Sequence, residues 1–343
     1  MYSCFGRTVA GSAVAACVLA LSACTGTVSV LPASHAAAQT ARAPQPQAPT
    51  TDACSSSTCM YVSDRTGTRL TVYIKTADGN VAPVRDIAGE ATTINQPIGV
   101  ALDATKALHV VNFGTNSLLV FAPGANGDVA PTKTIAGANT LLSGPAFIAL
   151  DSVGKSYVTN FFGSSVVVFS ASASGNVAPT KTIVGANTTL NEPLAVALDA
   201  NKKIYVANYG NNSVTVFGST AHGDATPIRT IAGSNTGLNG PSGIALDATG
   251  RIWVTNYNVD SVTAYASGAN GNVAPVLTIA GSKTGLGLPY DITFDSSGKI
   301  YVPNVTANSV TVYAANASGN AAPKRTLVGT NTLLSTPSGM ALR

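Results

Sequence analysis

The hydrophobic and polar positions of this chain repeat every 48 residues over most of its length. Three residue types return at this interval, at Asp103, Asp151, Asp199, Asp247 and Asp295, at Asn112, Asn160, Asn208, Asn256 and Asn304, and at Pro83, Pro131, Pro179, Pro227, Pro275 and Pro323. Short apolar, β-branched or alternating runs fill each unit and no segment keeps a helical period, so the pattern predicts strands. A repeat of this length made of strands alone is typical of β-propeller blades.

Each unit has four predicted strands, which the fifth copy shows at 243–247, 251–256, 261–265 and 275–280. A Gly-Asn or Gly-Asp step precedes the fourth strand in every copy and is typical of a hairpin turn, because these residues tolerate a positive φ. The fourth strand begins at the repeated proline and carries Arg or Lys in five of the six copies. Proline and charge are features of edge strands, so we expect this strand to be the exposed outer edge of its blade.

The two ends of the repeat predict how the ring closes. The first unit begins with a second strand at 59–64, whereas the last residues, 339–343, have the pattern of a first strand. Residues 51–55 occupy the position of a first strand but lack its pattern. We therefore expect an all-β fold, a six-bladed β-propeller of four-stranded blades at 56–343, whose first blade is shared between the N- and C-terminal parts of the chain.

Several segments of the repeat resemble a known propeller family. The segments PSGIALD at 241–247, IYVAN at 204–208 and SVTVF at 213–217 are similar to the NHL repeat, and YVTN at 157–160 is similar to the related YVTN-type repeat. The resemblance extends over every blade and implies the propeller fold. That family includes protein-binding and RNA-binding modules, extracellular sensors, lyases and scaffolds, so the resemblance leaves the function open.

The N-terminal segment has the pattern of an export signal. Arg7 precedes an apolar, Ala-rich run at 9–20. This run is shorter than the stretch of about 20 apolar residues that a membrane-spanning helix needs. The next four residues, LSAC at 21–24, resemble the lipobox of bacterial lipoproteins, in which the cysteine is acylated and becomes the mature N-terminus. We expect a signal peptide at 1–23, lipidated Cys24 and an Ala/Pro/Gln/Thr-rich tether at 24–55. The alternative is an ordinary signal peptide with an incidental cysteine.

Export also predicts the cellular location of the protein and the oxidation state of its cysteines. We expect a lipid-anchored protein of the cell envelope, in the outer membrane of a Gram-negative cell or otherwise on the extracytoplasmic face of the cell membrane. Cys4 and Cys17 leave with the signal, so only Cys54 and Cys59 remain once Cys24 carries lipid. An even pair in an oxidising compartment predicts a disulfide. A metal site is the alternative, although it lacks an adjacent histidine or second cysteine pair.

Composition excludes nucleic acid as a partner. The chain is 45% hydrophobic and only 10% charged, and its net charge is +4. No Lys/Arg run exceeds two residues, so the sequence has no basic patch that follows a phosphate backbone. Membrane contact is expected through the lipid anchor only.

The candidate catalytic and metal-binding residues are few. The repeated aspartates could form a carboxylate ring, but three of them are followed three residues later by Gly154, Gly250 or Gly298, which is typical of a turn. His109 replaces an aromatic residue of the repeat and has the pattern of a packed blade residue, while His222 lies in an outer hairpin. We expect no catalytic set, no metal and no cofactor.

Binding has a better candidate surface, where the second-to-third-strand turns and the starts of the first strands surround the channel. In four copies the turn has an asparagine followed by an aromatic residue, and other copies depart from the repeat at charged or aromatic positions. Half-exposed rings serve as contact platforms. The candidate residues are Asp64, Arg65, Phe113, Phe147, Phe161, Tyr209, Tyr257, Tyr290 and Asp291. Packing between blades, or neutral drift from the repeat, is the alternative explanation for each.

These patterns predict a monomeric binding or scaffold module in the bacterial cell envelope, with an unknown protein or envelope ligand as its partner. A propeller hydrolase or lyase, similar to a lactonase and acting on a small envelope metabolite, is the alternative.

Overall fold

The computed structural model describes residue 54 and residues 59–343. The predicted signal peptide, Cys24 and most of the tether lie outside the described residues. Within the described part, every regular element is a strand or a short 3-10 turn. No helix in this part is both long and apolar enough to cross a membrane.

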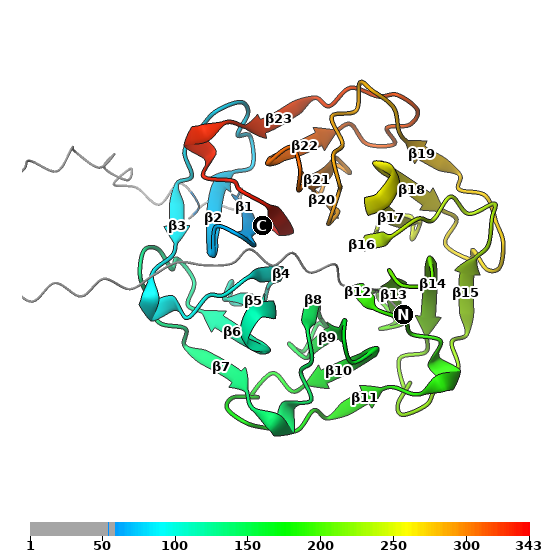
Figure 1. The fold of residues 1–343 in the computed structure, drawn as a ribbon, viewed down its shortest axis with the longest axis horizontal. Coiled ribbons are helices and arrows are strands. Elements are labelled where there is room, and N and C mark those ends of the chain that lie inside the picture. Colours follow the sequence, from blue (N-terminus) through cyan, green and yellow to red (C-terminus); the bar gives the residue numbers. More distant parts are fainter. Residues whose placement is uncertain (1–53, 55–58) are drawn as a thin grey trace, which may run out of the picture. The chain divides into compact units, whose positions relative to one another are not determined.

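The strands form six antiparallel sheets of four strands each, arranged as blades around a central axis (Figure 1). Blade one consists of β24 (Pro337–Leu342), β1 (Cys59–Asp64), β2 (Arg69–Ile74) and β3 (Arg85–Ile87). Blade two consists of β4 (Pro97–Leu102), β5 (Leu108–Asn112), β6 (Ser117–Phe121) and β7 (Lys133–Ala136). Blade three consists of β8 (Pro145–Leu150), β9 (Ser156–Asn160), β10 (Ser165–Phe169) and β11 (Lys181–Ile183).

The other three blades repeat this order from the channel outward. Blade four consists of β12 (Pro193–Leu198), β13 (Ile204–Asn208), β14 (Ser213–Phe217) and β15 (Arg229–Ala232). Blade five consists of β16 (Pro241–Leu246), β17 (Ile252–Asn256), β18 (Ser261–Tyr265) and β19 (Leu277–Ile279). Blade six consists of β20 (Thr293–Phe294), β21 (Ile300–Asn304), β22 (Ser309–Tyr313) and β23 (Arg325–Val328). The predicted all-β, six-bladed propeller is therefore confirmed.

Short 3-10 turns follow the second strand in two blades and link the fourth strand of one blade to the first strand of the next at four junctions. They are η1 (Glu90–Thr92), η2 (Phe113–Thr115), η3 (Ala138–Thr140), η4 (Ala186–Thr188), η5 (Tyr257–Val259) and η6 (Thr330–Thr332).

The two middle strands of each blade are buried on both faces, because each sheet packs between two neighbouring sheets. Every residue of β5, β9, β13, β17 and β21 is buried, including the polar ones. Each third strand has a buried aromatic residue at its last or last-but-one position, at Tyr73, Phe121, Phe169, Phe217, Tyr265 and Tyr313. These rings fill the wide outer part of the space between blades.

The first blade joins the two ends of the ring. Strand β24 pairs antiparallel with β1, and Met60 lies opposite Leu342. The backbone N–H of Arg343 donates to the carbonyl oxygen of Cys59 at 3.0 Å, and its guanidinium donates to the carbonyl oxygen of Cys54 at 2.6 Å. Cys54 and Cys59 form a disulfide with their Cα atoms 5.5 Å apart. The C-terminal residue thus contacts both cysteines of the disulfide.

The fourth strand differs from the prediction in two respects. It begins two residues after the repeated proline, at Arg85 rather than Pro83 and at Leu277 rather than Pro275, because proline cannot donate a ladder hydrogen bond. It is also not a free edge. The hairpin glycine of the next blade around the ring forms a parallel bridge with it, as between Gly175 and Ile135.

This contact is a two-part clamp between blades. The N–H of Gly175 donates to the carbonyl oxygen of Thr134 at 2.7 Å, and Ala136 N–H donates back to Gly175 at 3.2 Å. The side-chain oxygen of Asn176 then accepts from the backbone N–H of Asn139 at 2.8 Å. Gly175 has a φ of 73°, which glycine adopts without strain. The Gly-Asn and Gly-Asp steps thus shape the hairpins and also join the blades.

The clamp recurs at all six interfaces. Its side-chain acceptors are Asn80, Asp128, Asn176, Asp224, Asn272 and Asn320.

Asp291 makes a separate contact across the junction of blades six and one. It was one of the candidate binding residues, but its carboxylate is buried, with 8% of the residue exposed. One oxygen accepts from the N–H of Met340 in β24 and the other from the N–H of Ile292, both at 2.8 Å. The other copies have Gly, Phe or Ala at this position, and β20 is only two residues long. The departure from the repeat at Asp291 is therefore a packing feature of the ring closure.

We expect Asn176→Ala to lower the free energy of unfolding by about 1 kcal/mol, the net value of one hydrogen bond in a protein. Chemical denaturation of the purified domain measures this difference. Ser174→Ala, at an exposed position two residues earlier in the same hairpin, is the matched control and should leave stability unchanged. Equal stability of the two variants would show that the Asn176 side chain contributes nothing to the clamp.

We expect the stability of the protein to fall as pH rises from about 4 to 7. Burial raises the pKa of Asp291 to about 7, whereas an unfolded aspartate has a pKa of about 3.9. The folded state therefore favours the protonated form, and the stability that this form contributes is lost as pH rises through the folded pKa. Denaturation at several pH values should show a smaller fall for Asp291→Asn.

The control for this effect is Glu90→Gln, which removes an exposed carboxylate and should keep the pH dependence of the parent. A fall of the same size in Asp291→Asn would mean that another group causes it.

Candidate functional site

The repeated asparagines at the ends of the second strands build the turns of the channel face. Asn160 is fully buried. Its side-chain oxygen accepts from the N–H of Ser143 at 3.1 Å, and its amide nitrogen donates to the carbonyl oxygen of Leu141 at 2.9 Å. The same acceptor contact recurs at Asn112, Asn208, Asn256 and Asn304. Each asparagine ties its turn to the segment that leads into the first strand of its blade.

Asp64, one of the candidate binding residues, has this structural role in blade one. Its side chain is fully buried. One carboxylate oxygen accepts from the N–H of Gly67 at 2.8 Å, and the other accepts from the N–H of Ser335. Both oxygens accept from backbone N–H groups, so Asp64 ties its turn to the segment before β24 as the repeated asparagines do in the other blades.

The next residue of each turn points to the channel mouth. Phe113, Phe161, Tyr209 and Tyr257 occupy this position in blades two to five, and all are half-buried. The ring centroids of Phe161 and Tyr209 are 6.3 Å apart, as are those of Tyr209 and Tyr257. Tyr290, from the loop before β20, continues the series with its ring 5.8 Å from that of Tyr257. The structure thus brings these predicted residues together as one aromatic wall.

Phe147 supports this wall from behind. Its ring stacks on that of Tyr290 at 5.8 Å, and only 5% of the residue is exposed. It was a candidate for direct contact with a partner, but its side chain is packed inside the ring of blades. It holds Tyr290 in place instead.

Phe162 belongs to the wall and was not predicted. It is 69% exposed, and its ring lies 5.5 Å from that of Phe113 and 5.4 Å from that of Phe161. The equivalent residues in other copies are Gly114, Gly210, Asn258 and Thr306. A large apolar residue at a position that is otherwise small or polar is the sequence signal that identifies it.

Arg65 occupies the same turn position in blade one as the aromatic residues do in the others. Its guanidinium carbon lies 4.9 Å from the centroid of the Phe113 ring, which is the geometry of a cation–π contact. Within residues 54 and 59–343 it forms no salt bridge. The aromatic wall therefore ends in a cation that has no acidic partner in this part of the chain.

Two adjoining cavities open between these residues. The apolar one has a volume of about 370 Å³ and is lined by Arg65, Ile98, Phe113, Phe161, Phe162, Leu194, Tyr209, Tyr257 and Tyr290. The polar one has a volume of about 510 Å³ and is lined by Arg65, Thr66, Thr68, Asn95, Gln96, Tyr257, Tyr290, Val305, Thr336 and Ser338. Arg65, Tyr257 and Tyr290 line both, so we treat the two as the lobes of one site, the channel-mouth site.

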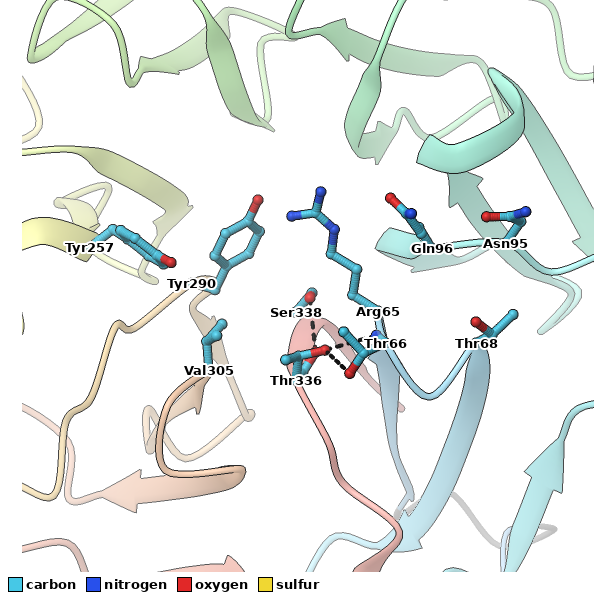
Figure 2. Close-up of a pocket in the computed structure, with 10 residues that line it drawn as sticks. All are labelled: Arg65, Thr66, Thr68, Asn95, Gln96, Tyr257, Tyr290, Val305, Thr336 and Ser338. Atoms are coloured by element: carbon cyan, nitrogen blue, oxygen red, sulfur yellow. Dashed lines mark hydrogen bonds between the residues drawn. The ribbon is translucent and has the colours of Figure 1, made fainter. Parts of the chain in front are cut away.

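Figure 2 shows how the polar lobe is arranged. Arg65 extends between Tyr290 on one side and Gln96 on the other, and Tyr257 lies beyond Tyr290. The hydroxyl groups of Thr66 and Thr336 are 2.8 Å apart and hydrogen-bonded to each other. Gln96, Thr336 and the other polar lining residues were not predicted, because they come from segments of ordinary loop composition.

The lining of the channel-mouth site contains few ionisable side chains. Burial raises the pKa of Tyr290 to about 12 and also raises that of Tyr257 above its ordinary value. Both phenols are therefore neutral at neutral pH. The lining residues include no Asp, Glu, His, Cys or Lys, so Arg65 carries the one formal charge of the lining.

The remaining candidates for chemistry have structural roles. Asp151 accepts from the N–H groups of Val153 and Lys155 at 3.0 and 2.9 Å, as a turn residue does. His109 is buried, with its Nε2 3.2 Å from an Asp103 oxygen. In the described part of the chain, no group of three or more His, Cys, Asp or Glu side chains could hold a metal ion.

Comparison with known sequences supports the repeat. The NHL repeat family matches residues 190–217, which contain β12, β13 and β14 of blade four. A comparison with curated proteins gave no match.

Comparison with solved structures supports the fold. A chain of a nidogen–laminin complex is 16% identical with a TM-score of 0.60, covering 82% of this chain and 97% of the other. A streptogramin B lyase is 12% identical with a TM-score of 0.56 and coverages of 81% and 82%. A protein of unknown function from Bacteroides caccae is 9% identical with a TM-score of 0.61 and coverages of 83% and 98%. At these identities the likeness extends to the fold alone, a six-bladed β-propeller in which residues 190–217 match the NHL repeat family.

Proposed function

We propose that this protein is a binding module of the bacterial cell envelope and that the channel-mouth site holds its partner. The observation that carries the proposal is the convergence of rings from four blades, together with Tyr290 and Arg65, on one concave site. Aromatic and arginine side chains are the residues that most often dominate binding energy. They supply large contact area and lose little conformational freedom on binding.

A hydrolase or lyase reaction receives less support from this site. Tyrosine and arginine are the ionisable residue types of the lining. The pKa of Tyr290, about 12, lies far above the range in which a general base works at neutral pH. Catalysis would need a group brought by the substrate or by a part of the chain outside the lining.

The proposed envelope location rests on the N-terminal sequence. The lipobox-like segment ends at Cys24, and an Ala- and Pro-rich stretch separates it from the first blade. A lipidated cysteine with several acyl chains would anchor the protein stably, and the tether would let the propeller stand away from the membrane surface.

We expect replacement of Tyr209 and Tyr257 together by Ala to abolish capture of the partner from detergent-solubilised envelope, because each truncation at a binding hot spot costs about 2 kcal/mol or more. Capture is measured in the presence of a chelator, so that metal-dependent binding does not contribute. A thermal melt of the same sample reports whether the domain is folded.

Val153→Ala is the control, because Val153 is 60% exposed and lines neither lobe. Undiminished capture by the folded double variant would move the binding site elsewhere. Loss of folding would show that the two rings are needed for packing between blades; the single variants Tyr209→Ala and Tyr257→Ala would then decide the matter of binding.

We expect Cys24→Ser to release the protein from the membrane fraction or to stall its processing, because serine cannot be acylated through sulfur. Fractionation of cells that produce the full chain, followed by mass determination, measures both outcomes. Cys17→Ser changes a cysteine within the apolar run and should leave anchoring intact. Normal maturation and unchanged membrane retention of Cys24→Ser would contradict the anchor.

A further inference from the structure

The channel-mouth site is chemically divided, and the division indicates the class of ligand. One lobe is walled by Phe113, Phe161, Phe162, Tyr209 and Tyr257 together with two aliphatic side chains, whereas the other is walled mainly by hydroxyl and amide groups. Arg65 stands at the boundary and lines both lobes. A ligand that fills the site therefore meets an apolar surface, a cation and a set of neutral hydrogen-bonding groups in that order.

The guanidinium of Arg65 is positioned to receive an anion. It is held over the Phe113 ring at 4.9 Å and has no salt bridge within residues 54 and 59–343. The adjacent phenols of Tyr257 and Tyr290 are neutral because burial raises the pKa of each. Partly apolar walls lower the local dielectric, which strengthens a charge-assisted hydrogen bond to this group.

The size and shape of the site favour a small molecule. A volume of about 370 Å³ in the apolar lobe and about 510 Å³ in the polar lobe lies in the range of small-ligand pockets. The rings of Tyr209 and Tyr257 both line the apolar lobe and are inclined to each other by 70°, so the edge of one ring meets the face of the other. A planar ring system can stack on the face and accept edge contacts from the neighbour.

We propose that the channel-mouth site binds a small organic anion, with an apolar ring system against Phe161, Tyr209 and Tyr257 and a carboxylate, sulfonate or phosphate group against Arg65. This inference rests on the proposed function and specifies the ligand of the same site. Hydroxyl or amide substituents of the ligand occupy the polar lobe, next to Gln96 and Thr336.

The test uses two fluorescent probes with the same aromatic skeleton. Anilinonaphthalene sulfonate carries one negative charge, and phenylnaphthylamine lacks the sulfonate and is neutral. Each is titrated into the folded full-length protein and into Arg65→Met, which removes the charge but keeps an apolar side chain of similar length. Lys324→Met removes one positive charge from an exposed residue outside both linings and is the control for net charge.

We expect the anionic probe to bind with a stoichiometry of one and its Kd to rise about tenfold or more in Arg65→Met, the effect of losing a hydrogen bond to a charged group. The Kd of the neutral probe should not change in Arg65→Met, and Lys324→Met should affect neither probe. High salt should weaken binding of the anionic probe and leave binding of the neutral probe unchanged.

Other outcomes separate this inference from the proposed function. One such outcome is that both probes bind at one site, lose affinity in Tyr209→Ala and keep their affinity in Arg65→Met. The site would then bind ligands without selecting anions, and the inference would be wrong. If neither probe binds with defined stoichiometry while the double tyrosine variant still loses partner capture, the site takes a protein rather than a small molecule. If the tyrosine substitutions change neither probe affinity nor partner capture, the site itself is wrongly placed.

Discussion

The structure depends on one interblade contact, the hydrogen-bonded clamp between the hairpin of each blade and the fourth strand of the blade before it. Gly175 and Asn176 make it between blades two and three, and the same pair of positions makes it at every other interface. The clamp occupies backbone groups that a fourth strand would otherwise expose, so the ring needs few surface charges to protect its edges. This explains how a chain with 10% charged residues presents six outer strands to solvent.

The repeat also explains where the candidate site lies. Arg65, Phe113, Phe161, Tyr209, Tyr257 and Val305 are separated by steps of 48 residues, so the ring places all six around one axis. The asparagine before five of them is committed to the turn, while the residue that follows is free to face the channel. Replacement of the aromatic residue by Arg65 in blade one and by Val305 in blade six breaks the symmetry, and this gives the site a charged end and an apolar wall.

Spacing alone predicted the fold, the strand order and the aromatic series, because a period of 48 residues fixes which positions are equivalent. Spacing could not predict where the side chain of a residue that differs from the repeat would point. Asp64, Phe147 and Asp291 depart from the repeat as visibly as Arg65 does, yet all three are buried and bonded or stacked within the ring. Phe162 was missed for the opposite reason, since it lies at a position where the other copies vary among Gly, Asn and Thr. The polar lobe contains amides and hydroxyls that have no distinct pattern in a chain rich in both.

The central claim is that the mouth of the channel holds a ring-bearing anion against Arg65. A crystal structure of the protein with bound anilinonaphthalene sulfonate tests it most directly. The account predicts that the aromatic rings lie against Tyr209 and Tyr257 and that the sulfonate oxygens lie about 2.7 to 2.9 Å from the Arg65 guanidinium nitrogens. A probe bound at the outer hairpins, or one at the channel mouth whose sulfonate points away from Arg65 into solvent, would contradict it.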